Sequence, residues 1–354
     1  MINSLRLQNF RSYSDYTTEL APGVNIIVGP NASGKTNLLE AVYVVNRGKS
    51  FKVSDKNLIK HNRDWARIDV TDDQGKRIWK LEEKSDKYDK SFNINETIVK
   101  RLTTKRQRAT TLFEPTHLRL LNGSPETRRT YLDQILVQTS YEFAAALSKY
   151  NRALRQRNSL LKQSKRTSSD DMFVWDVKLS EYGGLVNRQR KDLIKHLNAV
   201  AGKNYSKIAG KKTMVNIEYV DTITAKDYTS GFLKVLQESL PSDTMRGFTS
   251  QGPHREDFKV LIDGEDSSVT ASRGESRTLV LVLKLIELKL LEKELGQKPT
   301  LLLDDVFSEL DGKRRRALTE HISGYQTLIT TTDAEAVIEH FNTGEYKIIP
   351  TVRS

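Results

Sequence analysis

The chain has 354 residues, of which 37% are hydrophobic and 29% charged; this composition is typical of a globular protein and excludes a fibrous or wholly disordered class. It contains no cysteine, so disulfides and zinc–thiolate sites are excluded, and because its six histidines are scattered we expect no structural metal. The net charge of +12 is concentrated in residues 149–212, where 16 Lys and Arg stand against 5 Asp and Glu. This concentration favours a polyanionic partner such as a nucleic acid, and a solvated helical surface is the alternative.

The length exceeds that of an ordinary single domain, so two lobes or a core with a large insertion are expected. The first residues, MINSLRLQNFRSY, lack the apolar stretch of a signal peptide. The longest apolar run, residues 279–283, is too short to span a bilayer. We therefore expect a cytoplasmic protein.

Residues 24–45 are typical of a strand, a phosphate-binding loop and a helix in succession. VNIIV (24–28) is a β-rich run, GPNASGKT (29–36) is the loop, and the apolar positions of residues 37–45 have helical spacing. The glycines let the backbone curl around phosphate, Lys35 would reach the β and γ phosphates of a nucleotide, and Thr36 would bind Mg²⁺. The residues predicted to bind the nucleotide are Gly29, Pro30, Asn31, Ala32, Ser33, Gly34, Lys35 and Thr36.

The sequence pattern changes twice in the middle of the chain, from strand-like to helical and back. Residues 51–99 alternate short apolar runs with turns, which predicts a small antiparallel sheet. From about residue 122 helical patterns continue to about 205, and the polar stretch 162–171 divides them into two helices of an antiparallel arm. Strands resume near residue 213, and a mostly buried helix is expected over 277–295.

An acidic segment near the end of the chain completes the predicted nucleotide site. In PTLLLDDVFSELD (299–311), residues 301–303 would form a buried strand that ends at Asp304. Asp304 would hold Mg²⁺ through water, and Asp305 would polarise the attacking water. On their own, two adjacent acids after a strand are equally well explained as a turn or a helix cap.

The segment ASRGESRTLVLVLKL (271–285) places Ser272, Gly274 and Arg277 at the start of the long helix. It resembles the signature motif of ABC-type ATPases, in which the helix of one subunit points its N-terminus at the γ-phosphate held by another. Glu275 departs from this motif, which usually has Gln, and a carboxylate there would repel a phosphate. A plain helix N-cap at Ser272 is the alternative.

A whole arm inserted between the two halves of the nucleotide site resembles the SMC-like branch of ABC ATPases, and several segments narrow the resemblance to the RecF family. Beside the signature segment, they are LRLQNFRSY (5–13), GPNASGKTNLLEAVY (29–43), FEPTHLRLLNGSPETRRTYLD (113–133), YNRALRQRNSLLK (150–162), GPHREDF (252–258) and LLLDDVFSELDGKRR (301–315). The resemblance implies an α/β fold: an ABC-type P-loop ATPase core with mixed sheets and an inserted antiparallel helical arm. The expected parts are 1–121, the N-terminal part of the ATPase lobe; 122–212, the arm; and 213–354, the C-terminal part of that lobe.

The resemblance also implies roles for further residues. Arg11 would lie near the nucleotide, Glu114 at the position of a Q-loop residue, and the D-loop between subunits would include Ser308 and Asp311. Residues 330–333 would form a switch region after the last core strand. His254 and Arg255 belong to a family motif whose function the residues do not reveal, and a structural hydrogen-bonding role is an equal alternative.

The function implied by the resemblance is an ATP-dependent clamp on DNA. With ATP and Mg²⁺, two copies would dimerise around double-stranded or gapped DNA, and slow, DNA-stimulated hydrolysis would release them. In gap repair, replication, recombination and the SOS response, the protein would help RecR and RecO to load RecA, in the nucleoid. The alternative from another class is the nucleotide-binding subunit of a membrane transporter, against which the basic arm argues.

Two basic segments are candidates for the DNA contacts. The arm has the higher density of charge, and the segment KRLTTKRQR (100–108) carries five positive charges. The candidates in the second segment include Lys105 and Arg106. Those in the arm are Lys149, Arg152, Arg155, Arg157, Lys165, Arg166, Arg188, Arg190 and Lys191.

Overall fold

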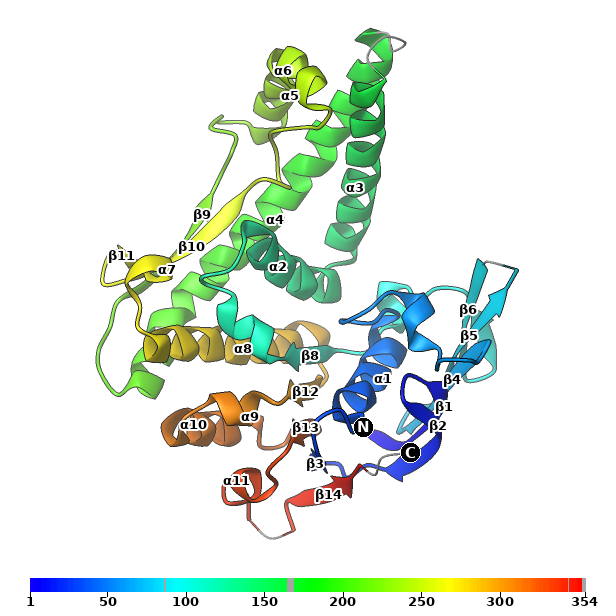
Figure 1. Ribbon diagram of the computed structural model, residues 1–354. Coiled ribbons are helices and arrows are strands. Elements are labelled where there is room, and N and C mark those ends of the chain that lie inside the picture. The colour runs from blue at the N-terminus through cyan, green and yellow to red at the C-terminus, as the bar shows by residue number, and fades with distance from the viewer. Residues whose placement is uncertain (86, 164–168, 343, 352–354) are drawn as a thin grey trace. The chain divides into compact units, whose positions relative to one another are not determined.

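The computed structural model describes residues 1–85, 87–163, 169–342 and 344–351. They form two compact units: unit 1 comprises Met1–Leu118 and Lys284–Ser354, and unit 2 comprises Arg119–Leu283. Figure 1 shows the elements of both units in chain order from blue to red. The mixed α/β architecture, with parallel and antiparallel sheets and long helices, is the predicted fold class.

Unit 1 contains a parallel sheet that carries the predicted nucleotide loop. Four of its five strands are buried along nearly their whole length, as parallel sheets covered on both faces require, whereas the edge strand β14 is largely accessible to solvent. In sheet order they are β14 (Tyr346–Pro350), β3 (Val24–Val28), β13 (Thr327–Thr331), β12 (Thr300–Asp304) and β8 (Thr110–Phe113). The strands predicted at 24–28 and 301–303 are confirmed, and both end at the edge of the sheet where parallel α/β proteins bind ligands.

The second sheet of unit 1 is antiparallel, and buried and exposed residues alternate along its strands. Its strands, in sheet order, are β2 (Tyr13–Glu19), β1 (Ile2–Phe10), β4 (Trp65–Asp72), β5 (Gly75–Lys84), β6 (Lys87–Ile94) and β7 (Thr97–Val99). The antiparallel sheet predicted from residues 51–99 is confirmed. The first two strands of the chain, β1 and β2, also belong to this sheet, which the sequence did not indicate.

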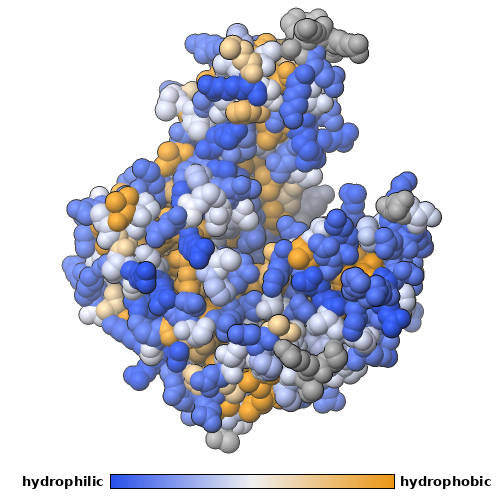
Figure 2. Space-filling view, viewed as in Figure 1, coloured by the Kyte–Doolittle hydropathy of each residue, from blue (hydrophilic) through white to orange (hydrophobic). Residues whose placement is uncertain are grey.

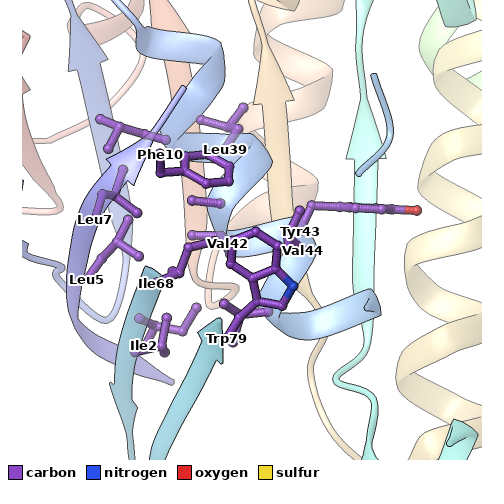
Figure 3. Close-up of a cluster of buried hydrophobic side chains, with 14 of the residues drawn as sticks. Ile2, Leu5, Leu7, Phe10, Leu39, Val42, Tyr43, Val44, Ile68 and Trp79 are labelled. Atoms are coloured by element: carbon purple, nitrogen blue, oxygen red, sulfur yellow. The ribbon is translucent and has the colours of Figure 1, made fainter. Parts of the chain in front are cut away.

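Helix α1 (Lys35–Arg47) packs against both sheets and forms the core of unit 1. Figure 3 shows Leu39, Val42 and Val44 of α1 among side chains of the antiparallel sheet. The ring centroids of Phe10 and Trp79 in this cluster are 5.9 Å apart, and the two rings meet edge to face. Burial of apolar side chains on both flanks fixes α1. The loop that precedes the helix is thereby held at one end of a rigid element.

The remaining helices of unit 1 are short. They are α9 (Val306–Glu309), α10 (Gly312–Ile322) and α11 (Glu335–Ile338), with 3-10 turns at Asp55–Leu58, Thr104–Arg106 and Pro115–Arg119, the last of which reaches the boundary with unit 2. The predicted long helix is α8 (Arg273–Leu295), which begins four residues earlier than residue 277. Residues 279–283 of α8 are each no more than 1% exposed, so the expected burial is confirmed. The boundary between the two units lies within this helix.

Unit 2 contains the helical arm and a three-stranded antiparallel sheet, β11-β10-β9. Its helices and strands, in chain order, are α2 (Pro125–Thr139), α3 (Tyr141–Lys162), α4 (Ser169–Ala209), β9 (Val215–Val220), α5 (Tyr228–Glu238), α6 (Leu240–Arg246), β10 (Asp257–Ile262), β11 (Glu265–Asp266) and α7 (Ser267–Thr270). Figure 1 shows α3 and α4 packed along each other as the pair expected for an arm.

The arm has three helices rather than the two that were predicted. The Ser140 hydroxyl accepts a hydrogen bond from the N–H of Phe143 at 3.0 Å and so begins a new helix, α3. Helix α3 ends at Lys162 and α4 begins at Ser169, so residues 162 and 169–171 of the predicted break are helical. Residues 164–168 of that break, with the candidate DNA contacts Lys165 and Arg166, lie outside the described residues.

Residues 213–283 belong to unit 2, whereas the predicted C-terminal part of the ATPase lobe begins at residue 213. The reason is packing: β9 and α5 both contact α4, so the small sheet is built onto the helices of the arm. The division of the chain into functional parts stays a prediction.

The surface in the view of Figure 2 is mostly hydrophilic, with scattered hydrophobic patches. The most exposed large hydrophobic side chains, Met245, Val269 and Ile98, belong to separate segments of the chain. Among the described helices, none combines the length and apolar character needed to cross a bilayer.

Candidate nucleotide site

The loop between β3 and α1 has the backbone of a phosphate cradle. Ala32 and Gly34 have left-handed φ angles of 64° and 94°, and Gly34 is the N-cap of α1 without any side-chain hydrogen bond to the helix. Neither an acidic residue nor a capping side chain occupies the first turn of α1. The first N–H groups of the helix, and the positive end of its dipole, therefore have no anionic group of their own and favour an external anion.

Lys35 is buried at the mouth of this loop. Its Nζ donates hydrogen bonds to the carbonyl oxygens of Gly29 at 2.8 Å and Pro30 at 2.9 Å. Burial lowers the pKa of Lys35, and the nearby carboxylates of Asp305 and Asp304 oppose this shift. These contacts hold the ammonium group within the loop, where it would meet a bound phosphate.

Thr36 and Asp304 come together across 268 positions of sequence. The Thr36 hydroxyl donates to the Asp304 carboxylate at 2.8 Å, and Thr330 of β13 donates to the same carboxylate at 2.8 Å. Hydroxyl and carboxylate oxygens suit Mg²⁺, which also keeps water and phosphate oxygens in its shell. The donor set therefore fits this cation, with Thr36 as a ligand and Asp304 beside it, and Mg²⁺ would supply charge neutralisation at the phosphates.

Asp305 follows β12 in an unusual conformation. Its φ is 52°, its N–H donates to Thr330 Oγ1 at 2.9 Å, and its carbonyl accepts from the Ser308 hydroxyl at 2.7 Å. Its buried Oδ1 has no hydrogen-bond partner among the described residues. Burial raises the pKa of Asp305, opposed by Lys35. A carboxylate with a free acceptor oxygen and a raised pKa has the properties of a general base.

The N-terminal FRSY segment supports the loop. The Tyr13 hydroxyl donates to the Gly34 carbonyl at 3.2 Å, and Asn37 donates to the Ser12 hydroxyl at 3.0 Å. Arg11 pairs with Glu40 of α1 at 3.1 Å and, with Ser12 and Asn37, lines a cavity of about 490 Å³. Arg11 therefore lies beside the start of α1, and its direct contact with a nucleotide stays a prediction.

The segment predicted as a signature motif is closed by its own side chains. The Ser272 hydroxyl accepts from the N–H of Glu275 at 3.2 Å, while the Glu275 carboxylate accepts from the N–H and the hydroxyl of Ser272 at 3.1 and 2.9 Å. This reciprocal pair is a capping box. Lys211 approaches the other oxygen of Glu275 at 3.2 Å. The hydrogen bond from Ser272 is the main reason that the pKa of Glu275 is lowered, so the carboxylate is ionised.

Ser272 is therefore the helix N-cap that the sequence analysis considered as the alternative, and the Glu275 carboxylate points back to Ser272. Contacts of Ser272, Gly274, Glu275 and Arg277 with a phosphate bound to another copy stay a prediction. The predicted D-loop residue Asp311 caps α10 by accepting from the N–H of Arg314 at 3.0 Å. Glu114 follows β8 and accepts from the Thr116 hydroxyl.

Residues 330–333, predicted to form a switch region, do not all follow the last strand of the core sheet. Thr330 and Thr331 lie within β13, and β14 comes later and pairs with β3, so β13 is not the last strand of the core sheet. As a consequence, Thr330 contacts both Asp304, the last residue of β12, and Asp305, which follows it. A Thr-rich strand, TLITT, is the signal from which this contact could have been suspected.

The GPHREDF segment belongs to unit 2, where it links several elements. His254 shares hydrogen bonds with the Tyr150 hydroxyl at 2.6 Å and the Thr249 carbonyl at 3.0 Å, and burial lowers its pKa to about 4. The buried Glu256 carboxylate accepts from the hydroxyls of Tyr219 and Tyr228. The structural role considered for His254 is therefore what the contacts support, whereas Arg255 lies exposed over the ring of Phe248.

The candidate DNA contacts divide by exposure. Those that reach solvent are Lys105, Arg106, Lys149, Arg152, Arg155 and Arg188. Arg157 is wrong as a DNA contact, because its side chain is 0% exposed and pairs with Asp176 at 2.6 Å and Asp243 at 2.7 Å. Arg190 is likewise buried against Asp133, and Lys191 pairs with Asp221. These cations hold the arm together, so only part of its excess charge is available to a partner.

Comparison with known proteins first gives the class. The structure superposes on the Smc head domain from Pyrococcus furiosus with a TM-score of 0.53 at 16% identity, covering 100% of this chain and 94% of that one, which supports the fold alone. Together with the phosphate loop and the acid-bearing strand, this defines an SMC-like ABC-ATPase fold. The RecF/RecN/SMC N terminal domain family matches residues 1–344.

Closer relatives then specify the family. The DNA replication and repair protein RecF of Clostridium botulinum (strain Okra) is 34% identical over 353 residues, covering 96% of this chain and 95% of the relative. RecF of Alkaliphilus oremlandii is 35% identical over 346 residues, covering 95% and 94%. A solved structure of the recombination mediator protein RecF-ATP in the RecFOR pathway has a TM-score of 0.84 at 32% identity and covers 94% of this chain and 92% of that one. The chain belongs to the RecF family.

Proposed function

We propose that the protein is an ATP-dependent DNA clamp of recombinational gap repair. The observation that carries this proposal is the meeting of Lys35, Thr36 and Asp304 at the uncapped N-terminus of α1. The names of its relatives support the setting: DNA replication and repair, and a RecFOR pathway with ATP. In this setting the protein would act in the cytoplasm on double-stranded and gapped DNA, and would help RecR and RecO to load RecA at junctions with single strands.

The roles of the site residues follow from their positions. The backbone of residues 29–34 and Lys35 hold the phosphates, and Thr36 with Asp304 holds Mg²⁺. Asp305 takes a proton from the attacking water, since its Oδ1 has no hydrogen-bond partner among the described residues. Hydrolysis at this site is expected to be slow and to act as a switch between the clamped and the released state.

A second copy of the chain would complete the site. Its Ser272, Gly274 and Arg277 would contact the γ-phosphate at the N-terminus of α8, with Ser308 and Asp311 at the subunit boundary. Because ATP then bridges two protomers, binding of ATP stabilises the dimer and hydrolysis releases it. A transporter subunit is set aside, because the RecF relatives match 95% or more of this chain.

The test of the nucleotide site is Lys35→Ala, with Lys347→Ala as the matched control on the same sheet, where the side chain lies 3.9 Å from the Glu19 carboxylate. Loss of charge-assisted hydrogen bonds to phosphate should weaken MgATP binding by about 100-fold or more. Sedimentation with duplex DNA, with and without ATP, tests ATP binding, dimerisation and DNA binding in one experiment. ATP-dependent dimers that persist in Lys35→Ala would contradict the proposal.

The DNA surface is tested by two matched triple variants. One replaces Lys149, Arg152 and Arg155 of the arm by Gln, and the other replaces Arg101, Lys105 and Arg106. Each lost phosphate contact should flatten the slope of log K against log salt by about 0.9, so the true surface should lose up to about 2.7. If the arm variant keeps the wild-type slope, the arm is not the contact.

A further inference from the structure

The phosphate loop has a neighbour that its own sequence does not reveal. Thr351, the residue after β14, is 6% exposed and lies against the loop, although 318 positions separate it from Ser33. Its N–H donates to the carbonyl of Val28 at 2.8 Å, which extends the pairing of β14 with β3 by one residue. The end of β14 is therefore held next to Val28, the residue directly before the loop.

The Thr351 hydroxyl connects this strand to the loop itself. Thr351 Oγ1 lies 2.7 Å from Ser33 Oγ and 3.2 Å from the Val28 carbonyl oxygen. A hydroxyl has one proton to donate and can also accept. All three groups are satisfied when Thr351 donates to Val28 and accepts from Ser33. Ser33, only 5% exposed, thus turns its side chain inward while Asn31 and Ala32 beside it are exposed.

The same hydroxyl accounts for Gly29. A Cβ added at Gly29 would lie 2.1 Å from Thr351 Oγ1 and 2.8 Å from Ser33 Oγ, closer than van der Waals contact allows. Gly29 has no positive φ, in contrast to Gly34, so here the glycine is needed for space rather than for backbone conformation. The first glycine of the loop and Thr351 are therefore two parts of one packing arrangement.

We propose that Thr351 is a positioning residue of the nucleotide site: through Ser33 it holds the phosphate loop in the geometry that places Lys35 and Thr36. This proposal rests on the proposed nucleotide site and adds a residue that contacts the loop and not the nucleotide. A loop that is already ordered loses less conformational entropy when phosphate binds, so the hydroxyl pair contributes to affinity. Its contribution to the hydrolysis step, which Asp305 carries, is small.

The experiment measures MgATP affinity by equilibrium titration for Thr351→Val, Ser33→Ala and the double variant, with Thr351→Ser retaining the hydroxyl. Thr111→Val is the matched control: Thr111 is a buried threonine of β8 in the same sheet, and its hydroxyl has no hydrogen-bond partner among the described residues. Thr351→Val should raise the Kd about fivefold, equivalent to about 1 kcal/mol, the usual contribution of one hydrogen bond. The KM should rise with the Kd while kcat stays within about twofold.

The pattern across variants separates positioning from stability. Thr351→Ser should restore wild-type affinity, Thr111→Val should leave it unchanged, and the double variant should be no worse than either single variant because both remove one interaction. A Thr351→Val protein that loses thermal stability but keeps its Kd, or additive losses in the double variant, would overturn the inference. If wild-type protein itself fails to bind MgATP, the proposed function fails instead.

Discussion

The N-termini of α1 and α8 are similar in sequence, but only the N-terminus of α8 is capped by side chains of its own. Each has a Ser and a Gly at or just before its first turn, in ASGKT (32–36) and ASRGE (271–275). At α1 the cap is Gly34, with no side-chain bond and no acid in the first turn. At α8 the Ser272 hydroxyl and the Glu275 carboxylate complete a capping box. The field of a helix terminus is the same in both cases. What differs is whether the chain supplies the anion itself.

This difference indicates distinct energetic roles. At α1 an external phosphate meets donors that no acidic side chain competes for, so binding energy is available in full. At α8 a phosphate has to replace a carboxylate that already receives two hydrogen bonds from Ser272. The second contact is therefore the weaker one, and within the proposed function it suits a dimer that has to open again.

The largest expected effect is on the hydrolysis step at the nucleotide site, with ATP binding nearly unchanged. Asp305→Asn removes the charge and the basicity of the carboxylate but not the backbone contacts to Thr330 and Ser308. Loss of a general base should lower single-turnover hydrolysis by about 100- to 1,000-fold, with MgATP affinity within a few-fold of wild type. Asp304→Asn is the contrast, because it should weaken the dependence of binding on Mg²⁺. Unchanged hydrolysis in Asp305→Asn would show that Asp305 is not the general base.

A smaller effect is expected when the cradle at α1 is distorted. In Gly34→Ala the residue keeps a φ of 94°, and its Cβ would lie 2.7 Å from Ser12 Oγ and 2.9 Å from the Tyr13 hydroxyl. Strain of about 1–2 kcal/mol should weaken MgATP binding about tenfold. Gly296→Ala is the control, since Gly296 also has a positive φ, 64°, but nothing lies within 4 Å of its Cβ position. Equal losses in the two variants would show that the packing against Ser12 and Tyr13 is irrelevant.

The sequence predicted the parts of this site that depend on neighbouring residues. A strand, a glycine-containing loop and a helix follow from local patterns, and the run 301–303 before two acids predicts a buried strand with carboxylates at its end. These predictions are confirmed for β3, α1 and β12. The long buried helix was also predicted, because apolar residues cover most of its faces.

The sequence did not predict contacts that depend on strand order. Thr330 and Thr351 reach the site only because β13 and β14 flank β3, and nothing local fixes that order. Burial of cations was missed for a similar reason: Arg157 reads as a basic surface residue, but acids 19 and 86 positions away neutralise it. Charge counted along the chain overestimates charge at the surface whenever the partners are distant in sequence.

The smallest expected effect tests the comparison of the two helices directly. Glu275→Gln keeps a side chain that can cap α8 but removes the negative charge that a γ-phosphate would meet. The ATP-dependent dimer should become about fivefold tighter, by about 1 kcal/mol, since an exposed charge is well screened. Analytical ultracentrifugation with a non-hydrolysable ATP analogue measures the dimer constant, and the gain should shrink as salt is raised.

Two further experiments check whether the charge of Glu275 weakens the dimer, as this prediction assumes. Lys211→Met removes the cation that faces Glu275 at 3.2 Å, so the dimer should weaken rather than tighten. The pKa of Glu275 is lowered below its ordinary value of 4.5, so its ionised cap is present at neutral pH and is lost only as the pH falls through that lowered value. Between pH 6 and 8 the charge is constant, and pH should not reproduce the effect of Glu275→Gln. A dimer that weakens in Glu275→Gln would mean that the carboxylate aids the second contact, and the two helix termini would then differ less than their caps indicate.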